Sequence, residues 1–334
     1  MPSFTVFKGH ESGNPVKSTT TKPDELTEDY VLIRITASGL CGTDLHFRRA
    51  NMVLGHEGVG IVESLGPNTT HLKKGDRVGW GYETDSCGHC IECLQGSENF
   101  CPERHMYAEK NTDQGSFATH AIWREAFLHL IPEKLSDVAA APLQCGGATV
   151  FAALDGVRAT DTVGILGVGG LGHLAIQFAA KMGCRVVVLS SSERKKDEAL
   201  KLGAHEFIAM KGLSTLTDSI STPLNRLLVT AAVPPSWDLL VPILAPRANI
   251  YPITVSPGSL EIPYMTLIGT GVKIIGTMVP ARAVHRRMLE FAAFQGVEPL
   301  VEEFAMTEEG IKEAMERLER GEVRYRAVLI PEGK

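Results

Sequence analysis

The chain has 334 residues, 44% of them hydrophobic and 22% charged, and this length predicts two domains. Its 33 basic and 39 acidic residues give a net charge of −6 without a basic block, which argues against a nucleic-acid partner. We see no apolar run typical of a membrane span and no signal-peptide pattern at the start, so we expect no membrane partner and a cytoplasmic protein.

The first part of the chain predicts a small, irregular β-rich domain. Strands are expected over residues 30–35 and 58–64, because both stretches are rich in β-branched residues. Turns are expected at residues 66–68 and 74–76, which read G-P-N and K-G-D.

Two short motifs in this domain carry the side chains of a metal site. Residues 41–46 read C-G-T-D-L-H, and residues 55–57 read G-H-E. Cysteine, histidine and glutamate are all zinc ligands, and three protein ligands with one exchangeable position make a catalytic site. The alternative is that each is an ordinary core or surface residue.

A second group of metal-type ligands follows. Four of the seven cysteines fall within fifteen residues, at two-residue gaps and one longer return. They are Cys87, Cys90, Cys93 and Cys101. Four thiolates at this spacing predict a closed, tetrahedral structural zinc site, and a disulfide or redox role is the weaker alternative.

The middle of the chain predicts a strand over residues 126–132 and a helix over 135–141 with Ser136 as its cap. Cys145 then precedes a helical run at 150–154.

A nucleotide-binding lobe is predicted next. A strand at 161–166 leads into a G-x-G-x-x-G loop, a helix at 173–181 and a second strand at 185–189. This strand–loop–helix–strand context places a pyrophosphate at the helix N-terminus, although a glycine turn without a ligand remains the alternative. The loop residues expected at the cofactor are Gly167, Gly169, Gly170, Leu171 and Gly172.

The end of the second strand predicts the type of dinucleotide. An NAD site would place an acidic residue here, but the chain reads S-S-S-E-R-K at 190–195. Hydroxyl groups and cations hold a 2′-phosphate, so we expect Ser190, Ser191 and Lys195 to bind NADP(H). A solvated basic helix start is the alternative.

Further strands are expected at 227–231, 247–253 and 272–276. Helices are expected at 283–295 and 307–320.

Taken in order, C-G-T-D-x-H, G-H-E and C-x₂-C-x₂-C-x₇-C resemble the zinc-dependent medium-chain alcohol dehydrogenases over essentially the whole chain. The S-S-S-x-(K/R)-K run is similar to their NADP-dependent, cinnamyl-alcohol-dehydrogenase-like branch. The resemblance implies an α/β protein. A GroES-like, irregular β-rich catalytic domain would cover residues 1–146 and 277–334, and a Rossmann domain with a doubly wound parallel sheet would cover 147–276. It also implies a homodimer or homotetramer.

The resemblance also assigns roles to the metal-site residues. It implies a catalytic zinc bound by Cys41, His56 and Cys145, with Glu57 beside the metal as an occasional fourth ligand. Asp44 would orient His56, as metal-bound imidazoles generally require.

Other roles concern the proton and the cofactor. Thr43 would bond the substrate oxygen and His46 would carry the proton onward, unless His46 is an ordinary surface or core histidine. Thr149 and Arg326 would contact the cofactor, the arginine at its phosphates; an edge-strand surface arginine is the alternative.

One departure stands out. Only fourteen residues separate Cys41 from His56, fewer than the family usually has. The missing loop normally lies near the substrate, so we expect a more open or differently shaped pocket.

These features predict an oxidoreductase with two Zn²⁺ per chain that transfers a hydride between NADP(H) and a small alcohol, aldehyde or ketone, in the reductive direction. A reductase of iminium groups or activated alkenes is one alternative. A dinucleotide-binding protein without turnover is another, but such a protein has no chemical need for the complete set of metal-site residues.

Overall fold

The computed structural model describes residues 3–22, 25–231, 236–256 and 259–332. The chain divides into two compact units. Unit 1 comprises Met1–Ala148 and Val279–Lys334, and unit 2 comprises Thr149–Met278.

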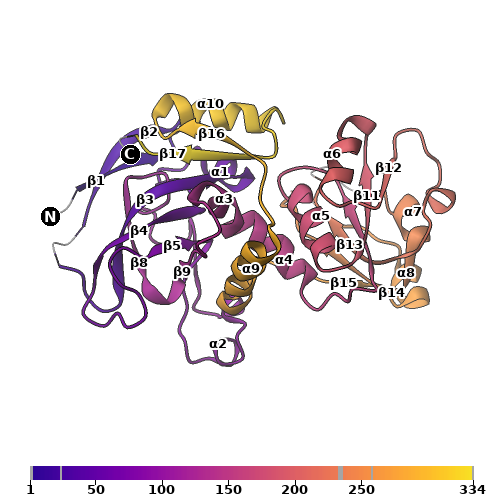
Figure 1. Cartoon of the computed structure of the whole chain (residues 1–334), viewed down its shortest axis with the longest axis horizontal. Helices are drawn as coiled ribbons and strands as arrows, with labels where there is room; N and C mark the ends of the chain where they lie inside the picture. Colours follow the sequence, from indigo (N-terminus) through magenta and orange to yellow (C-terminus); the bar gives the residue numbers. More distant parts are fainter. Residues whose placement is uncertain (1–2, 23–24, 232–235, 257–258, 333–334) are drawn as a thin grey trace. The chain divides into compact units, whose positions relative to one another are not determined.

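Unit 1 holds most of the strands (Figure 1). Its strands are β1 Ser3–Lys8, β2 Val16–Thr21, β3 Tyr30–Leu40, β4 Gly58–Leu65, β5 Arg77–Trp80, β6 Glu83–Asp85, β7 His105–Met106, β8 His120–Arg124, β9 His129–Leu130, β16 Val301–Ala305 and β17 Arg326–Ile330. Its helical segments are α1 Gly42–Phe47, α2 Ile91–Leu94, the 3₁₀ turns η1 Glu98–Phe100 and η2 Glu125–Phe127, α3 Asp137–Pro142, the π turn η3 Leu143–Gly147, α9 Arg282–Gln295 and α10 Glu308–Glu319, with α4 Ala148–Leu154 following directly.

The main sheet of unit 1 brings distant parts of the chain together. Within the described residues it runs β16-β17-β3-β4-β5-β9, and β8 pairs with β3. The predicted strands at 30–35 and 58–64 are confirmed as β3 and β4, and β3 extends to Leu40, next to the first metal-ligand motif. Figure 1 shows α10 (yellow) along β16 and β17. Thr307 caps α10 by accepting the Gly310 N–H at 3.1 Å.

The segment after β8 differs from its prediction. Instead of a continuous strand over 126–132, the chain forms the turn η2 and then the short strand β9. The predicted helix is confirmed: the Ser136 hydroxyl accepts the Ala139 N–H at 3.1 Å at the start of α3. Cys145 lies within the π turn η3, which joins α3 to α4 without a break.

This helical run is also apolar. Among the residues described, Asp137–Leu154 alone has the length and composition of a membrane span, with a mean hydropathy of 1.2, although no such run was expected. Of that run, 72% is buried inside the protein, as in the core helix of a folded domain.

Unit 2 contains a parallel sheet. Its strands are β10 Thr162–Leu166, β11 Arg185–Ser190, β12 Glu206–Ala209, β13 Leu224–Val229, β14 Leu244–Pro252 and β15 Lys273–Ile274. Its helical segments are α5 Gly172–Lys181, η4 Glu193–Lys195, α6 Lys196–Lys201, η5 Thr217–Ser219, α7 Trp237–Leu240, η6 Val241–Ile243 and α8 Tyr264–Thr270.

The strand order of unit 2 is that of a doubly wound sheet. In the described part of the chain it runs β12-β11-β10-β13-β14-β15, and every neighbouring pair is parallel. In Figure 1, α5 and α6 lie on one side of these strands and α7 on the other. The order reverses between β10 and β13, and ligands of such sheets bind at that point, beyond the carboxyl ends of the strands.

Candidate functional site

The four predicted cysteines converge in unit 1. Their ligand atoms all lie within 4.8 Å of one another. The Sγ–Sγ distances are 3.5 Å for Cys87–Cys101, 3.6 Å for Cys90–Cys93 and 3.9 Å for Cys87–Cys93. Four sulfurs bound to zinc at about 2.3 Å would lie about 3.8 Å apart, whereas a disulfide needs about 2.0 Å. The geometry therefore fits a closed zinc site.

The loop that carries these cysteines is anchored to α9 at the end of the chain. Arg282 donates to Oε1 of Glu98 through its backbone N–H at 2.7 Å and through Nε at 2.9 Å. The Asn99 amide donates to the Val279 carbonyl at 3.0 Å.

A second set of donors forms a separate cluster. The ligand atoms of Cys41, His56, Glu57 and Cys145 lie within 4.8 Å of one another. Cys41 is the N-cap of α1, His56 and Glu57 precede β4, and Cys145 comes from the π turn η3. Cys41 Sγ lies 3.2 Å from His56 Nε2, close to the value of about 3.5 Å for two ligands of a tetrahedral zinc. The donor types and their spacing fit zinc.

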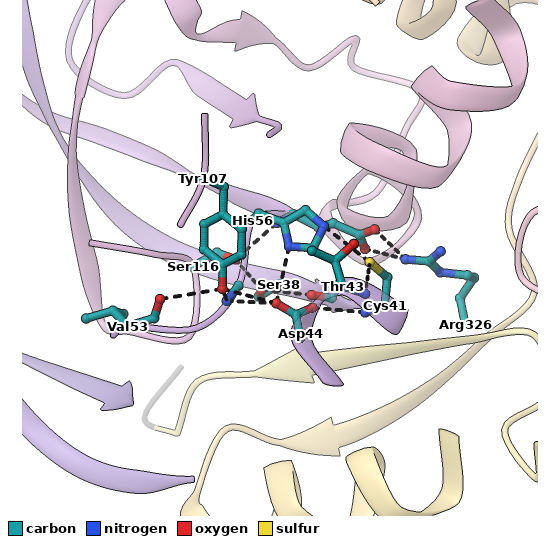
Figure 2. Close-up of polar contacts among 12 residues, drawn as sticks. Ser38, Cys41, Thr43, Asp44, Val53, His56, Tyr107, Ser116 and Arg326 are labelled. Carbon is teal, nitrogen blue, oxygen red and sulfur yellow. Dashed lines mark hydrogen bonds and ion pairs between the residues drawn. The ribbon is translucent and has the colours of Figure 1, made fainter. Parts of the chain in front are cut away.

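Asp44 holds two of these donor residues, Cys41 and His56, in position (Figure 2). Its Oδ1 lies 3.2 Å from His56 Nδ1, and its Oδ2 accepts the Cys41 N–H at 3.0 Å. Both Asp44 and His56 are fully buried. A neutral His56 that donates through Nδ1 to the Asp44 carboxylate keeps Nε2 free to bind a metal.

Tyr107 and Ser116, which carried no sequence signal, complete the support of the site. The Tyr107 hydroxyl accepts the Gly55 N–H at 2.8 Å and donates to Asp44 at 3.3 Å. Burial raises its pKa well above its usual value, so it stays a donor. Ser116 Oγ accepts the Glu57 N–H at 3.2 Å. Gly55 has a φ of +95°, and a Cβ there would lie 2.3 Å from Ser116 Oγ, so only glycine fits.

Glu57 is paired with Arg326 of β17. Arg326 Nη2 lies 2.5 Å from both carboxylate oxygens, and both side chains are buried. Burial raises the pKa of Glu57 to about 7, and the guanidinium opposes that rise. Arg326 thus lies beside the metal-type donors, and its contact with a cofactor stays a prediction.

The thiols and the imidazole of the cluster influence one another. The hydrogen bond shared by the two thiols lowers the pKa of Cys41 and raises that of Cys145. Burial alone would lower the pKa of His56, but the charges of Cys41 and Asp44 raise it overall. Metal ions bind the thiolate and the neutral imidazole, so zinc uptake here would release protons.

The two predicted proton-transfer residues lie on α1. The Thr43 backbone N–H donates to Cys41 Sγ at 3.4 Å, which places Thr43 beside the donor cluster (Figure 2). His46 is exposed on the last turn of α1 and is not part of the cluster. Their part in proton transfer stays a prediction.

Unit 2 has a cavity of about 360 Å³ where β10 and β11 end. Of the residues predicted to bind a cofactor, Gly167, Ser190, Ser191 and Lys195 line it. Gly169, Gly170 and Leu171 continue the loop to Gly172 at the start of α5, while Thr149 lies in α4. Arg194, Met210 and Ser236 also line the cavity and were not among the predicted site residues.

The geometry of this loop requires glycine at two positions. Gly167 has a φ of +98°, and a Cβ on Gly172 would lie 2.1 Å from the Gly167 carbonyl oxygen, so both positions need glycine. The Thr230 hydroxyl lies 2.9 Å from the Leu166 carbonyl oxygen and also 2.9 Å from that of Gly167. Lys195 Nζ donates to the Val168 carbonyl at 2.6 Å, so its cation lies at the rim of the loop. Hydroxyls, a lysine and a glycine loop at one cavity fit a phosphorylated dinucleotide.

Two family models match the chain. The alcohol dehydrogenase GroES-like domain matches residues 27–133, and the zinc-binding dehydrogenase model matches residues 170–293.

Individual proteins are similar along nearly the whole chain. Cinnamyl alcohol dehydrogenase 8 of Arabidopsis thaliana is 32% identical over 322 residues, which cover 91% of this chain and 89% of the relative. The alcohol dehydrogenase of Geobacillus stearothermophilus is 33% identical over 328 residues, 94% of this chain and 96% of the relative. The structure of a cinnamyl alcohol dehydrogenase from Sorghum bicolor matches with a TM-score of 0.91 at 31% identity and covers 98% of each chain.

Proposed function

The chain belongs to the zinc-containing medium-chain alcohol dehydrogenases, in their cinnamyl-alcohol-dehydrogenase-like branch, and we propose that it reduces aldehydes with NADPH at a zinc ion held by Cys41, His56 and Cys145. As a member of this family it is an oxidoreductase that transfers a hydride between a nicotinamide cofactor and an alcohol or aldehyde. What we propose beyond family membership is the identity of the zinc ligands, the preference for NADP(H) and the reductive direction of the reaction.

The observation that carries the proposal is the convergence of four metal-type donors around the buried Asp44–His56 pair. The donors come from three separate segments, and Asp44 holds two of those segments together. A protein that only binds a dinucleotide gains nothing from this arrangement, which supports turnover.

The residues of the site divide the work. A zinc ion bound there would act as a Lewis acid toward the substrate oxygen. Asp44 holds His56 in the ligating tautomer, and Glu57 stays beside the ligands through its pairing with Arg326. Thr43 would deliver a proton to the substrate oxygen, and the exposed imidazole of His46 would take that proton up from water.

NADP(H) is the proposed cofactor because the end of β11 carries hydroxyls and a lysine where an NAD site has a carboxylate. Ser190, Ser191 and Lys195 would hold the 2′-phosphate, and the glycine loop with Leu171 would hold the pyrophosphate. Thr149 and Arg326 are proposed as further contacts. Supporting this, Nε of Arg326 is buried and has no hydrogen-bond partner within the described residues.

We also propose a domain division, a structural zinc site, a compartment and an oligomeric state. The zinc-binding catalytic domain comprises residues 1–146 and 277–334, with a structural zinc at Cys87, Cys90, Cys93 and Cys101; the NADP-binding domain comprises residues 147–276. We propose a cytoplasmic homodimer or homotetramer, because thiolate ligands suit a reducing compartment and the family resemblance implies an oligomer.

The test combines metal content with turnover. The purified protein should contain two zinc ions per chain and should oxidise NADPH with one or more aldehydes of a panel that includes cinnamaldehyde and formaldehyde. Two zinc ions with no turnover on any carbonyl would refute the proposed reaction. Saturation of the alkene of cinnamaldehyde with the aldehyde left intact would identify the alternative, an alkene reductase.

A further inference from the structure

Unit 1 contains a second buried polar cluster that the proposed chemistry does not use. We call Glu83, His129, Gln144, Arg282 and His285 the Glu83 cluster. They line a cavity of about 10 Å³, close to the smallest volume that holds a single water. Glu83 is 7% exposed, and the two histidines are each 4% exposed.

Three polar atoms of this cluster are unpartnered. Among the described residues, both carboxylate oxygens of Glu83 and Nδ1 of His129 have no hydrogen-bond partner. A buried polar atom without a partner is costly, and one ordered water in a polar cavity is the usual remedy. The two side chains line the same cavity, so one water can serve both.

The cluster is connected to the segment of Cys145. The rings of His129 and His285 are stacked at 4.0 Å between centroids, at an angle of 25°. His285 Nε2 lies 3.0 Å from Gln144 Oε1, and Gln144 Nε2 donates to the Ala140 carbonyl at 3.0 Å. An amide oxygen only accepts, so His285 carries its proton on Nε2. This histidine therefore holds the residue that precedes Cys145.

The other end of the cluster adjoins His56. Tyr82, the chain neighbour of Glu83, packs its ring edge-on against the His56 ring at 5.5 Å and 87°. A displacement of Glu83 would therefore act on two of the proposed ligands, on Cys145 through Gln144 and on His56 through Tyr82.

Burial and the charges around the cavity determine the protonation state of Glu83. The titratable groups around it are Tyr82, Asp85, Glu98, Arg104, Arg282, His129 and His285. Burial above all, and then Glu98, raises the pKa of Glu83 to about 8, although Arg282 and Arg104 oppose the rise. Arg282 is already paired with Glu98 at 2.9 Å. Burial also lowers the pKa of His285 to about 3 and that of His129 well below its usual value, so neither supplies a positive charge.

We propose that Glu83 is a positioning residue for the zinc site that works as a neutral acid: its carboxyl donates to one buried water, and that water donates to Nδ1 of His129. The stacked histidines then hold Gln144, and with it Cys145, in place. An ionised Glu83 would instead leave a buried carboxylate without a partner and loosen the Cys145 segment. The inference rests on the proposed role of Cys145 and His56 as zinc ligands.

Infrared spectroscopy of the carboxyl group tests the protonation directly. Wild type should show a protonated-carboxyl band at pH 7 that disappears with a midpoint near pH 8. The difference spectrum against Glu83→Gln isolates the band from other carboxyls. Glu303→Gln, a change at an exposed position of β16, should keep it. A wild-type spectrum without a protonated-carboxyl band that titrates near pH 8 would overturn the inference, whether or not the variant folds.

Zinc release tests the positioning. With a pKa of about 8, the ionised fraction of Glu83 rises about tenfold between pH 7 and pH 9. Release of one zinc to a chromophoric chelator should accelerate by a similar factor in wild type and Glu303→Gln, but less than about twofold in Glu83→Gln. Equal acceleration in all three proteins would refute the positioning role and leave the proposed function untouched. Fewer than two zinc ions in wild type would instead count against the proposed function.

Discussion

A single nitrogen of Arg326, Nη2, lies 2.5 Å from both carboxylate oxygens of Glu57, and both residues are buried in unit 1. The pair ties β17, near the end of the chain, to the residue beside His56. The remaining buried donor Nε has no partner within the described residues, so the guanidinium keeps capacity for a second anion.

Replacement of Arg326 should therefore be costly. Arg326→Met leaves the Glu57 carboxylate buried and unpaired, which should reduce the free energy of unfolding by about 3–5 kcal/mol. Urea unfolding at pH 7 measures this change. The control is Arg48→Met, which removes an exposed pair with Glu319 and should cost less than about 1 kcal/mol. Equal decreases in the free energy of unfolding in the two variants would show that the buried pair stabilises the fold no more than the exposed pair does.

The cofactor prediction centres on Ser190 at the end of β11. Ser190→Asp places a carboxylate where we propose the 2′-phosphate, so the ratio of kcat/KM for NADPH over NADH should fall about 10–100-fold, the equivalent of one lost charge-assisted hydrogen bond or more. Ser219→Asp, at an exposed position of η5, should leave the ratio unchanged. An unaltered ratio in Ser190→Asp would place the 2′-phosphate elsewhere.

The four-cysteine site predicts a specific metal count. Cys93→Ser should reduce bound zinc from two ions to one per chain and lower the thermal stability, because a closed zinc site contributes folding energy. Elemental analysis by mass spectrometry counts the metal. Cys184→Ser, which alters a cysteine of unit 2 outside both donor clusters, should retain two. Two zinc ions in Cys93→Ser would contradict the assignment.

The burial of Glu83 should make the folded protein less stable as the pH rises. Its pKa is about 8 in the folded protein against an ordinary 4.5, so folding favours the protonated form. The stabilisation is complete below pH 4.5 and is lost as the pH rises to 8 and above, by about 5 kcal/mol in total. Urea unfolding at pH 5, 7 and 9 should show this fall in wild type and a smaller one in Glu83→Gln. Parallel pH profiles would contradict it.

Much of the architecture could be predicted because its signals are local. The glycine loop between β10 and α5 and the caps Ser136 and Thr307 each need only a few neighbouring residues. The four-cysteine cluster is equally compact in sequence, since its spacing already limits the sulfurs to one site.

The rest depends on contacts between distant residues. Tyr107 supports Asp44 across 63 positions, and His285 holds Gln144 across 141, so neither pairing has a sequence period or motif. The strand expected at 126–132 is shortened because the Leu128 N–H donates to the Glu125 carbonyl and closes a turn. Glu83 belongs to none of the motifs identified in the sequence, and only its burial in the folded chain reveals it.

The central claim is that the zinc held by Cys41, His56 and Cys145 carries the reaction. The most direct measurement is NADPH oxidation with an aldehyde substrate by Cys145→Ala, in a preparation whose zinc content and NADPH binding have been determined. We predict one remaining zinc per chain, retained NADPH binding and no detectable turnover. Wild-type turnover in this variant, with one zinc or two, would contradict the claim.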